Sequence, residues 1–337
     1  QGPVEVCGIL NSELVTVVVP SYNHPEFLER RMESILAQTY ANIEIIVIDD
    51  CSTANNVEIL GKYLSDRRVR LVARKENGGV TVVTNQGVGL SSGKYVIFAQ
   101  CDDDCDSRMI ERLVVSLQSH PAAAIAFCRS LMIDESDRVL GDDFAVRERS
   151  FRIRCAADTL IGGHEMRRFL LHSCVIPNLS GALFRRAAFQ DVGVFSTAYR
   201  ACIDWDLFFR LTDRYDFFYV AEPLNRFRQH GATIRSATKG RITYDEFFRL
   251  LLGEIRRGGL SAGERVRFRL HVMYLWAVDL IRPSLAGWEN FFHHFRQIWL
   301  LDPFALPFLP LAILQRIFEL PAKMIRRYSR SSREDVA

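Results

Sequence analysis

The chain has 337 residues, which is enough for two domains or one large domain. Apolar residues make up 48% of it and charged residues 25%, so a sizeable core can be buried and a disordered protein is excluded. The net charge of +3 is compatible with an anionic small molecule or an anionic membrane surface. We expect no nucleic-acid partner.

The cysteine usage indicates the redox environment. Eight cysteines are scattered along the chain, and none forms a Cys-x-x-Cys pair. Their density is low for a disulfide scaffold, so we expect reduced thiols in a cytoplasmic protein. We expect no signal peptide. Gln1-Gly2-Pro3 resembles the remnant of a cleaved expression tag, and residues 1–13 are set apart from the folded domains.

The first half alternates strand and helix patterns. Residues 14–20 (LVTVVVP) form a β-branched run that predicts a buried strand ended by proline. Pro25 suits the first turn of the helix that follows, and the apolar residues after it recur on one helical face. Further strands are predicted at 43–48, 68–73 and 94–99, and a second helix at 81–93. This alternation predicts an α/β fold with a mostly parallel, Rossmann-like sheet flanked by helices.

Polar side chains follow three of these strands. Ligands of such sheets bind at the carboxyl ends of the strands. The residues at these ends are Pro20, Ser21, Tyr22 and Asn23, then Asp49 and Asp50, then Gln100, Cys101, Asp102, Asp103 and Asp104. An aromatic ring there could stack on a base, and a carboxylate could accept hydrogen bonds from a base or ribose. The aspartate triplet could hold a divalent cation with its phosphates, and oxygen ligands suit Mg²⁺ or Mn²⁺.

Each of these groups also has an ordinary structural interpretation. The Asp49–Ser52 segment is typical of a helix start or a turn. The acidic run 102–106 could be a solvated loop, and a lone tyrosine such as Tyr22 is more often a packing residue. The arrival of all three groups at one edge of the sheet favours a binding site.

Several segments, in this order, resemble glycosyltransferase family 2, whose members have the GT-A fold. The segments are VVVPSYNHPEFLERRMESILAQTYANIEIIVIDDCST, ENGGVTVVTNQGVGLSSGKYVIFAQCDDD, SGALFRRAAFQDVGVF, IDWDLFFRL and PLNRFRQHGATI. The resemblance extends over residues 14–235, roughly the first two thirds of the chain. It implies an inverting enzyme that takes a sugar from a nucleotide diphosphate, with a divalent metal, Mn²⁺ or Mg²⁺, as cofactor.

The resemblance also implies roles for single residues. The positions that contact the nucleotide in this family correspond to Pro20, Tyr22, Asn23, Asp50, Gln100 and Asp102. The metal positions correspond to Asp102, Asp103, Asp104 and His230. The general base corresponds to Asp204 in the segment IDWDLFFRL. Without the resemblance, Asp204 would be interpreted as a helix N-cap and His230 as a surface or core residue.

The sequence departs from the family pattern at three positions. Gln100 replaces the first aspartate of the Asp-x-Asp motif, which leaves the exact metal ligand open. Ile203 replaces an acidic residue before the base, and Thr84 replaces an arginine that contacts a phosphate or base. Asp206 lies two residues after the base, on another helical face, and is expected to be structural or acceptor-binding.

The second half is expected to bind the acceptor and then to become helical. We set the nucleotide-sugar half at 14–132, the acceptor and base half at 133–238, and a helical C-terminal region at 239–337. The longest apolar run in that region, PFALPFLPLAIL, is too short to span a bilayer. Its aromatic residues, together with Lys323, Arg326, Arg327 and Arg330, favour peripheral contact with the inner face of the plasma membrane. Packing on the core, or on another subunit in a homo-oligomer, is the alternative.

Together these observations predict a metal-dependent inverting glycosyltransferase. Its partners would be a nucleotide-sugar donor, with UDP as the expected nucleotide, and a glycan or lipid-linked acceptor in cell-surface polysaccharide synthesis. Two alternatives stay open. One is a nucleotidyltransferase, although SYNHPEFL lacks the Gly-rich basic loop which that class needs. The other is a catalytically silent nucleotide-sugar-binding module.

Overall fold

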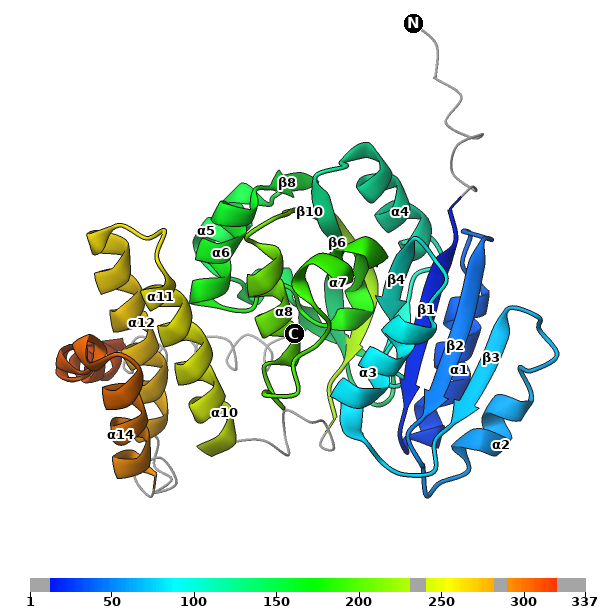
Figure 1. The fold of residues 1–337 in the computed structure, drawn as a ribbon, viewed down its shortest axis with the longest axis horizontal. Coiled ribbons are helices and arrows are strands. Elements are labelled where there is room, and N and C mark those ends of the chain that lie inside the picture. Colours follow the sequence, from blue (N-terminus) through cyan, green and yellow to red (C-terminus); the bar gives the residue numbers. More distant parts are fainter. Residues whose placement is uncertain (1–12, 231–240, 282–289, 320–337) are drawn as a thin grey trace, which may run out of the picture. The chain divides into compact units, whose positions relative to one another are not determined.

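A computed structural model describes residues 13–230, 241–281 and 290–319. The chain divides into two compact units, Gln1–Thr233 and Ile234–Ala337, and each is described by itself. Within the described residues, the first unit contains all the strands and the second is helical (Figure 1).

The first unit alternates strands and helices along most of its length. Its strands are β1 (Val15–Ser21), β2 (Ile43–Asp49), β3 (Val69–Ala73), β4 (Tyr95–Phe98), β5 (Asp104–Cys105), β6 (Ala123–Ile133), β7 (Val139–Asp142), β8 (Thr159–Ile161), β9 (Ala182–Arg185) and β10 (Asp216–Arg228). Its helices are α1 (Pro25–Leu36), α2 (Asn56–Gly61), α3 (Gly79–Leu90), α4 (Met109–Ser119), α5 (Arg149–Arg154), α6 (Gly163–His172), α7 (Arg186–Val192) and α8 (Ile203–Leu211), with short 3₁₀ turns η1 (Phe144–Val146) and η2 (Leu179–Gly181).

These strands form one ten-stranded sheet. Its order is β3-β2-β1-β4-β9-β6-β10-β5, with β7 added beside β6 and β8 beside β10. Strands β1 to β4 pair in parallel, as their apolar runs predict, and β6 pairs in parallel with β10. Strands β5, β7, β8 and β9 pair antiparallel with their neighbours. The predicted α/β fold is confirmed, and the second half of the sheet adds antiparallel pairs that the apolar pattern does not reveal.

Helices cover both faces of the sheet because the central strands are apolar on both sides. On one face, Leu28 and Met32 of α1 pack with Leu113 of α4 against alternate residues of β1, β2 and β4. Each such side chain stabilises the fold by about 1.5–3 kcal/mol when fully buried. On the other face, the ring of Phe98 in β4 lies 5.7 Å from the ring of Phe184 in β9 and 5.2 Å from that of Phe195.

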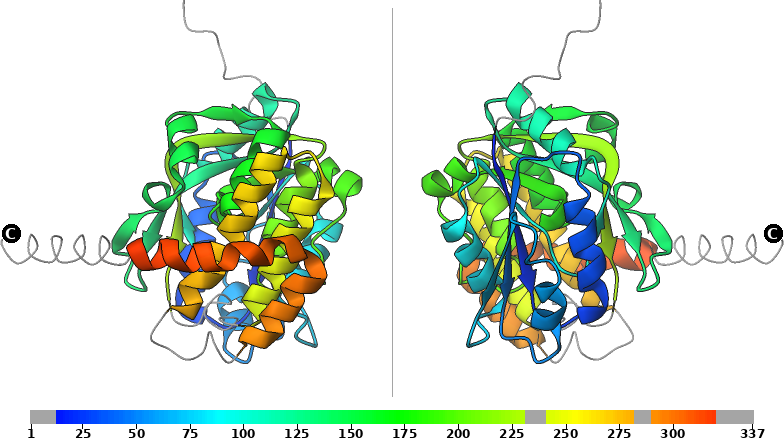
Figure 2. Two further views of the ribbon diagram at one scale, coloured as in Figure 1. Left: turned by 90° about the vertical axis from the view of Figure 1, so that its left-hand side faces the viewer. Right: turned by 90° about the vertical axis from the view of Figure 1, so that its right-hand side faces the viewer.

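The second unit is a small helical bundle with its own core. Its elements are α10 (Arg241–Phe247), a π-helical turn η3 (Phe248–Leu252), α11 (Gly253–Arg257), α12 (Ala262–Leu280), α14 (Phe291–Leu301) and η4 (Pro303–Phe308). Residues 309–319 continue as a helix that crosses the others in the left view of Figure 2. The ring of Trp276, fully buried, lies 5.8 Å from that of Phe248 and 5.3 Å from that of Phe291.

Two expectations from the sequence concern the chain as a whole. The seven cysteines in the described residues are free thiols, as expected. Within the same residues, no helix combines the length and the hydropathy that crossing a membrane requires. The basic residues Lys323, Arg326, Arg327 and Arg330 lie outside the described residues.

Candidate active site

The candidate site lies where β1 and β2 end. The two strands run in register to their last residues, so that Ser21 lies opposite Asp49. One residue further, the Asp50 amide donates to the Ser21 carbonyl at 2.8 Å. Tyr22 and Asp50 therefore leave the sheet side by side. The backbone then turns sharply, because His24 and Cys51 have positive φ angles of 57° and 62°. Such a conformation costs a residue other than glycine about 1–2 kcal/mol, and strain of this kind concentrates at functional sites.

The predicted nucleotide contacts in the first loop differ in their environment. Pro20 is buried at the end of β1, whereas Tyr22 is 45% exposed and its ring is accessible to a ligand. The Asn23 side-chain carbonyl accepts the Thr53 amide at 3.1 Å, and the backbone amide of Asn23 donates to the Ser52 hydroxyl at 2.9 Å. The Asn23 side chain therefore holds the first two loops together.

Asp50 is buried in a cluster of donors. Its two carboxylate oxygens accept the amides of Gly78 at 2.8 Å and Gly79 at 2.7 Å. The Nε of Arg74 lies 2.8 Å from the same carboxylate. An ionised carboxylate has about four lone-pair positions, so these three donors leave one for a ligand. By contrast, Asp49 accepts the hydroxyl of Ser52 at 2.6 Å and closes the turn, as the structural interpretation of this segment proposes.

Asp102 and His230 are brought together from distant parts of the chain. His230 Nε2 lies 2.9 Å from Asp102 Oδ2. The His230 ring is almost fully buried, and the Asp102 carboxylate is partly exposed. The hydrogen bond to Asp102 raises the pKa of His230 above its usual value. The pair forms because β10, which leads to His230, runs beside the acidic loop that precedes β5.

Asp103 points into the protein. Its carboxylate accepts the Arg228 amide at 3.0 Å and the Asn178 side-chain amide at 2.8 Å, and it also interacts with the Ser180 hydroxyl. Burial raises the pKa of Asp103 to about 7, the neighbouring Asp102 charge adds to the rise, and Arg31 opposes it. Asp103 therefore joins the acidic loop to β10 and to the turn before β9.

Asp104 is neutralised by the protein. It begins β5, and its carboxylate lies 3.1 Å from the Arg30 guanidinium of α1 and 3.1 Å from that of Arg226 on β10. Two guanidinium groups on one carboxylate disfavour a further cation there. Of the three predicted metal aspartates, Asp102 is therefore the one whose surroundings best suit a metal.

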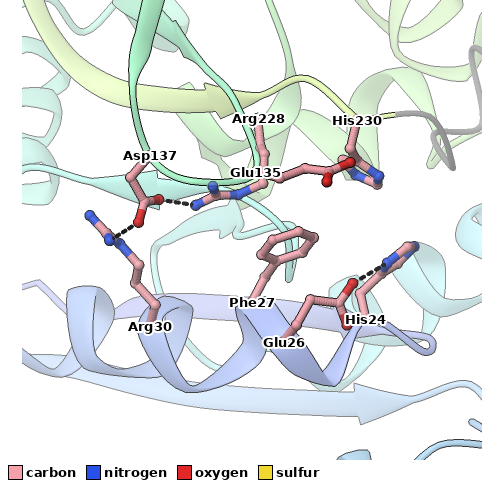
Figure 3. A pocket seen from close by; sticks show the side chains of 8 residues that line it. All are labelled: His24, Glu26, Phe27, Arg30, Glu135, Asp137, Arg228 and His230. Carbon is pink, nitrogen blue, oxygen red and sulfur yellow. Dashed lines mark hydrogen bonds and ion pairs between the residues drawn. The ribbon is translucent and has the colours of Figure 1, made fainter.

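A pocket of about 450 Å³ lies beside His230, between the start of α1, the turn before β7 and the end of β10 (Figure 3). Phe27 points into it beneath Arg228, whose guanidinium lies 4.6 Å from the ring centroid. The ring of His24 lies edge-on to that of His230 at 5.0 Å. The full lining is His24, Glu26, Phe27, Arg30, Glu135, Asp137, Arg228 and His230. Its carboxylates, guanidinium groups and aromatic face suit a polar ligand.

The side chains of Asp102 and His230 suit a metal ion whose remaining ligands come from water and a bound substrate. In the part of the chain that the structure describes, no group of three or more His, Cys, Asp or Glu side chains is arranged to hold a metal ion. Asp102 and His230 offer one oxygen and one nitrogen. Mg²⁺ and Mn²⁺ accept such a partial protein set, because they retain waters and bind substrate phosphates.

Asp204 lies in the first turn of α8, and its carboxylate accepts the Trp205 amide at 2.8 Å. The buried Trp205 indole donates to the Leu170 carbonyl at 3.1 Å, which anchors α8 on α6. The N-cap of α8 is Cys202, so Asp204 does not occupy the N-cap position itself. The Asp206 carboxylate, two residues further along α8, pairs with Arg210 one turn later at 2.9 Å.

Comparison with known proteins identifies the family. Residues 16–193, more than half of the chain, match the sequence family described as glycosyl transferase family 2. The chain belongs to this family. Glycosyltransferase GlyG of Streptococcus pneumoniae serotype 4 is 39% identical over 143 residues, which are 41% of this chain and 47% of GlyG. The putative teichuronic acid biosynthesis glycosyltransferase TuaG of Bacillus subtilis is 32% identical over 36% of this chain and 49% of TuaG. The matches thus span about half the length of these two relatives.

Solved structures confirm the fold of this family 2 chain. TarS of S. aureus, residues 1–349 in complex with UDP-GlcNAc, aligns with a TM-score of 0.66 and 16% identity over 88% of this chain and 83% of that one. The mannosyltransferase PcManGT of Pyrobaculum calidifontis, in complex with GDP-Man and Mn²⁺, aligns with a TM-score of 0.52 and 15% identity over 95% of this chain and 90% of that one. The predicted GT-A fold is confirmed.

The structure shows what surrounds the three residues that depart from the family pattern. The backbone amide of Gln100 donates to the Ser180 hydroxyl at 3.1 Å, which fixes the backbone of the acidic loop. Thr84 is buried and donates to the Val80 carbonyl inside α3. Arg74 brings a positive charge to Asp50 instead. Ile203 is buried at the start of α8.

Sequence reasoning missed the cations of this site. The predicted acidic residues form ion pairs with Arg74, Arg30 and Arg226, and none of these was singled out. Arg228, whose guanidinium donates to the Asp102 backbone carbonyl at 2.7 Å, was also missed. The signal for two of them was present in the segment NRFR before His230, where arginines stand two residues apart. Side chains at that spacing lie on one face of a strand.

Proposed function

We propose that this chain is a metal-dependent inverting glycosyltransferase. It would take a sugar from a nucleotide diphosphate, with UDP as the expected nucleotide, and pass it to a glycan or lipid-linked acceptor in cell-surface polysaccharide synthesis. The observation that carries the proposal is the Asp102–His230 pair, 2.9 Å apart, beside the carboxyl ends of the parallel strands. Family membership supports sugar transfer over nucleotidyl transfer.

In this proposal, some residues of the site bind the sugar donor and another activates the acceptor. Tyr22 would stack on the base, and Asp50, positioned by Arg74, would accept a hydrogen bond from it. Asp102 and His230 would hold the cation, which when bound neutralises charge on the leaving diphosphate. Asp204 would take the proton of the acceptor hydroxyl as that oxygen attacks the anomeric carbon and the bond to the diphosphate breaks. A positioned base typically contributes a factor of about 10²–10⁴ to the rate.

Thermal shift tests the donor site, because a ligand that binds only the folded protein raises its melting temperature. We expect UDP with Mn²⁺ to give a larger shift than GDP, ADP or CDP with Mn²⁺, and than UDP with EDTA. Equal shifts from all nucleotides would contradict the base-recognition roles of Tyr22 and Asp50.

Turnover of a UDP-sugar tests catalysis. Asp204→Asn should keep the UDP–Mn²⁺ shift and lose about 10²-fold or more in rate, because it removes the base and leaves the donor site intact. Asp206→Asn is the matched control, since this carboxylate pairs with Arg210 in the same helix. If Asp204→Asn kept its rate, another residue would have to be the base. Donor binding by a wild-type chain that turns over no UDP-sugar would favour the silent binding module.

A further inference from the structure

The end of the second unit exposes an unusual proportion of apolar side chains. Between residues 291 and 319, thirteen residues are exposed and eleven of them are apolar. Phe292 is 84% exposed, Trp299 59% and Phe304 69%. The large exposed side chains of this apolar face are Phe292, Phe295, Trp299, Leu300, Phe304, Leu311, Leu314, Ile317 and Phe318.

The spacing of these residues explains why they share surfaces of their helices. Phe292, Phe295 and Trp299 follow one another at intervals of three and four in α14, so they lie on one side of it. His294 and Ile298 of the same helix are buried on the other side, against the core of the unit. The exposed aromatic side is therefore additional to the side that the fold needs.

The charged residues around the apolar face indicate which kind of partner it binds. Its exposed polar residues are Arg296 and Gln315. The acidic Asp302 is buried, with its carboxylate 2.7 Å from Arg269 Nε. Glu319 is only partly exposed and accepts the Tyr274 hydroxyl. Within residues 291–319, the acidic groups are thus turned inward and a cation is left outside.

The sequence after residue 319 adds further positive charge. Residues 320–337 carry five basic and two acidic residues. Aromatic and aliphatic side chains on one side of a helix, with basic residues next to them, are typical of helices that lie in the interface of an anionic bilayer. Two copies of this chain, facing each other through the same surface, would bring their two Arg296 side chains toward one another.

We propose that the apolar face is a membrane-binding surface that inserts shallowly into a bilayer containing anionic lipids. This partner is additional to the donor and acceptor of the proposed reaction. A membrane-bound enzyme would meet a lipid-linked acceptor at the surface on which that acceptor is held. Vesicle binding requires neither nucleotide nor turnover, so the two proposals can fail separately.

Vesicle sedimentation of the full chain tests the proposal. We expect the protein to bind phosphatidylcholine vesicles containing about one quarter phosphatidylglycerol at least threefold more tightly than vesicles of phosphatidylcholine alone. The triple variant Phe292→Ser, Trp299→Ser, Phe304→Ser should bind the anionic vesicles at least tenfold more weakly. Arg296→Glu should reduce the preference for the anionic lipid.

A matched control removes three exposed apolar side chains from the first unit. Val139, Val146 and Ile153 are 60%, 72% and 68% exposed, and their replacement by serine should leave vesicle binding unchanged. Equal losses in both triple variants would overturn the proposal, and so would a wild-type chain that binds neither vesicle.

Two measurements keep the test decisive. If the variant does not fold, amide hydrogen exchange of the wild-type chain with and without anionic vesicles replaces it, and protection within 291–319 is expected. Unchanged exchange in this segment would overturn the proposal. Light scattering tests whether a second copy of the chain covers the apolar face instead. A dimeric wild-type chain and a monomeric triple variant would show that it does, and would overturn the proposal.

Discussion

At the scale of single residues, three consecutive aspartates meet three different environments. Asp102 contacts His230, Asp103 is buried among neutral donors and Asp104 lies between two arginines. Their proximity is tolerated because protein cations and donors surround two of the three carboxylates. Because of this asymmetry, Asp102 is the carboxylate that we propose as a ligand of an added cation.

Replacing Asp102 tests this assignment. We expect Asp102→Asn to weaken Mn²⁺-dependent UDP binding about tenfold or more, since the amide lacks the charge that a hard cation prefers. The control is Asp106→Asn in the same acidic segment, where the carboxylate pairs with Arg108. Titration of UDP at fixed Mn²⁺ measures both. Equal weakening in the two variants would point to the net charge of the segment instead of a metal ligand.

Arg74 offers a second residue-scale prediction. Its guanidinium contacts the buried Asp50, so Arg74→Met would leave a buried carboxylate without its cation. We expect a loss of about 1–3 kcal/mol in the free energy of unfolding and weaker UDP binding. Arg68→Met removes the partner of the more exposed Asp66, a pair expected to contribute about 0–1 kcal/mol. Chemical denaturation compares them, and similar losses would show that Arg74 has no special role.

The sequence reveals the acidic residues of the site but not their partners. Aspartates at strand ends can be recognised because they interrupt apolar runs, and His230 follows from its family segment. Arg74 and Arg30 resemble ordinary surface arginines in the sequence, and only the folded chain shows which carboxylate each one meets. Long flexible side chains carry little positional information, so these contacts could not be predicted.

At the scale of elements, predictability follows the length of the apolar pattern. Strands β1 to β4 and helix α1 were predicted within a few residues, because each buries a continuous run or a clear helical face. Strand β5 has two residues and β8 has three, too few for any period to appear. These short strands depend on β10, a 13-residue strand that carries the arginines and ends next to His230.

The junction of α6 with α8 tests how an element positions the proposed base. A Cβ at Gly163 would lie 2.3 Å from the Thr212 carbonyl and 2.5 Å from that of Tyr215, both backbone atoms. Gly163→Ala should therefore destabilise the protein by about 1–3 kcal/mol. It should also lower turnover more than UDP binding, because α6 supports α8 through Trp205.

The neighbouring glycine provides the control. A Cβ at Gly162 would meet only one atom within 4 Å, at 3.8 Å in the Asp216 side chain. Gly162→Ala should change the melting temperature far less than Gly163→Ala does. If both variants melted alike, crowding at the α6 terminus would not explain the sensitivity of this junction.

At the scale of the whole molecule, the first unit holds the candidate active site, and the described residues of the second unit are helical. Asp50, Asp102, Asp204 and His230 all lie in the first unit, and the apolar face lies in the second. The helical character of the second unit was predictable from its periodic apolar residues. Its exposed face was not, because a sequence cannot show which apolar residues of a helix the fold leaves uncovered.

This division predicts what each unit does alone. A protein ending at residue 233 should still show the UDP–Mn²⁺ thermal shift, because the core of the first unit and every proposed donor contact lie within it. The same protein should lose binding to anionic vesicles, because it lacks the apolar face. Thermal shift and sedimentation of the two proteins side by side measure both effects. A truncated protein that melts cooperatively but does not respond to UDP would show that residues 234–337 contribute to the donor site. A truncated protein that still sediments with vesicles would place the membrane contact in the first unit.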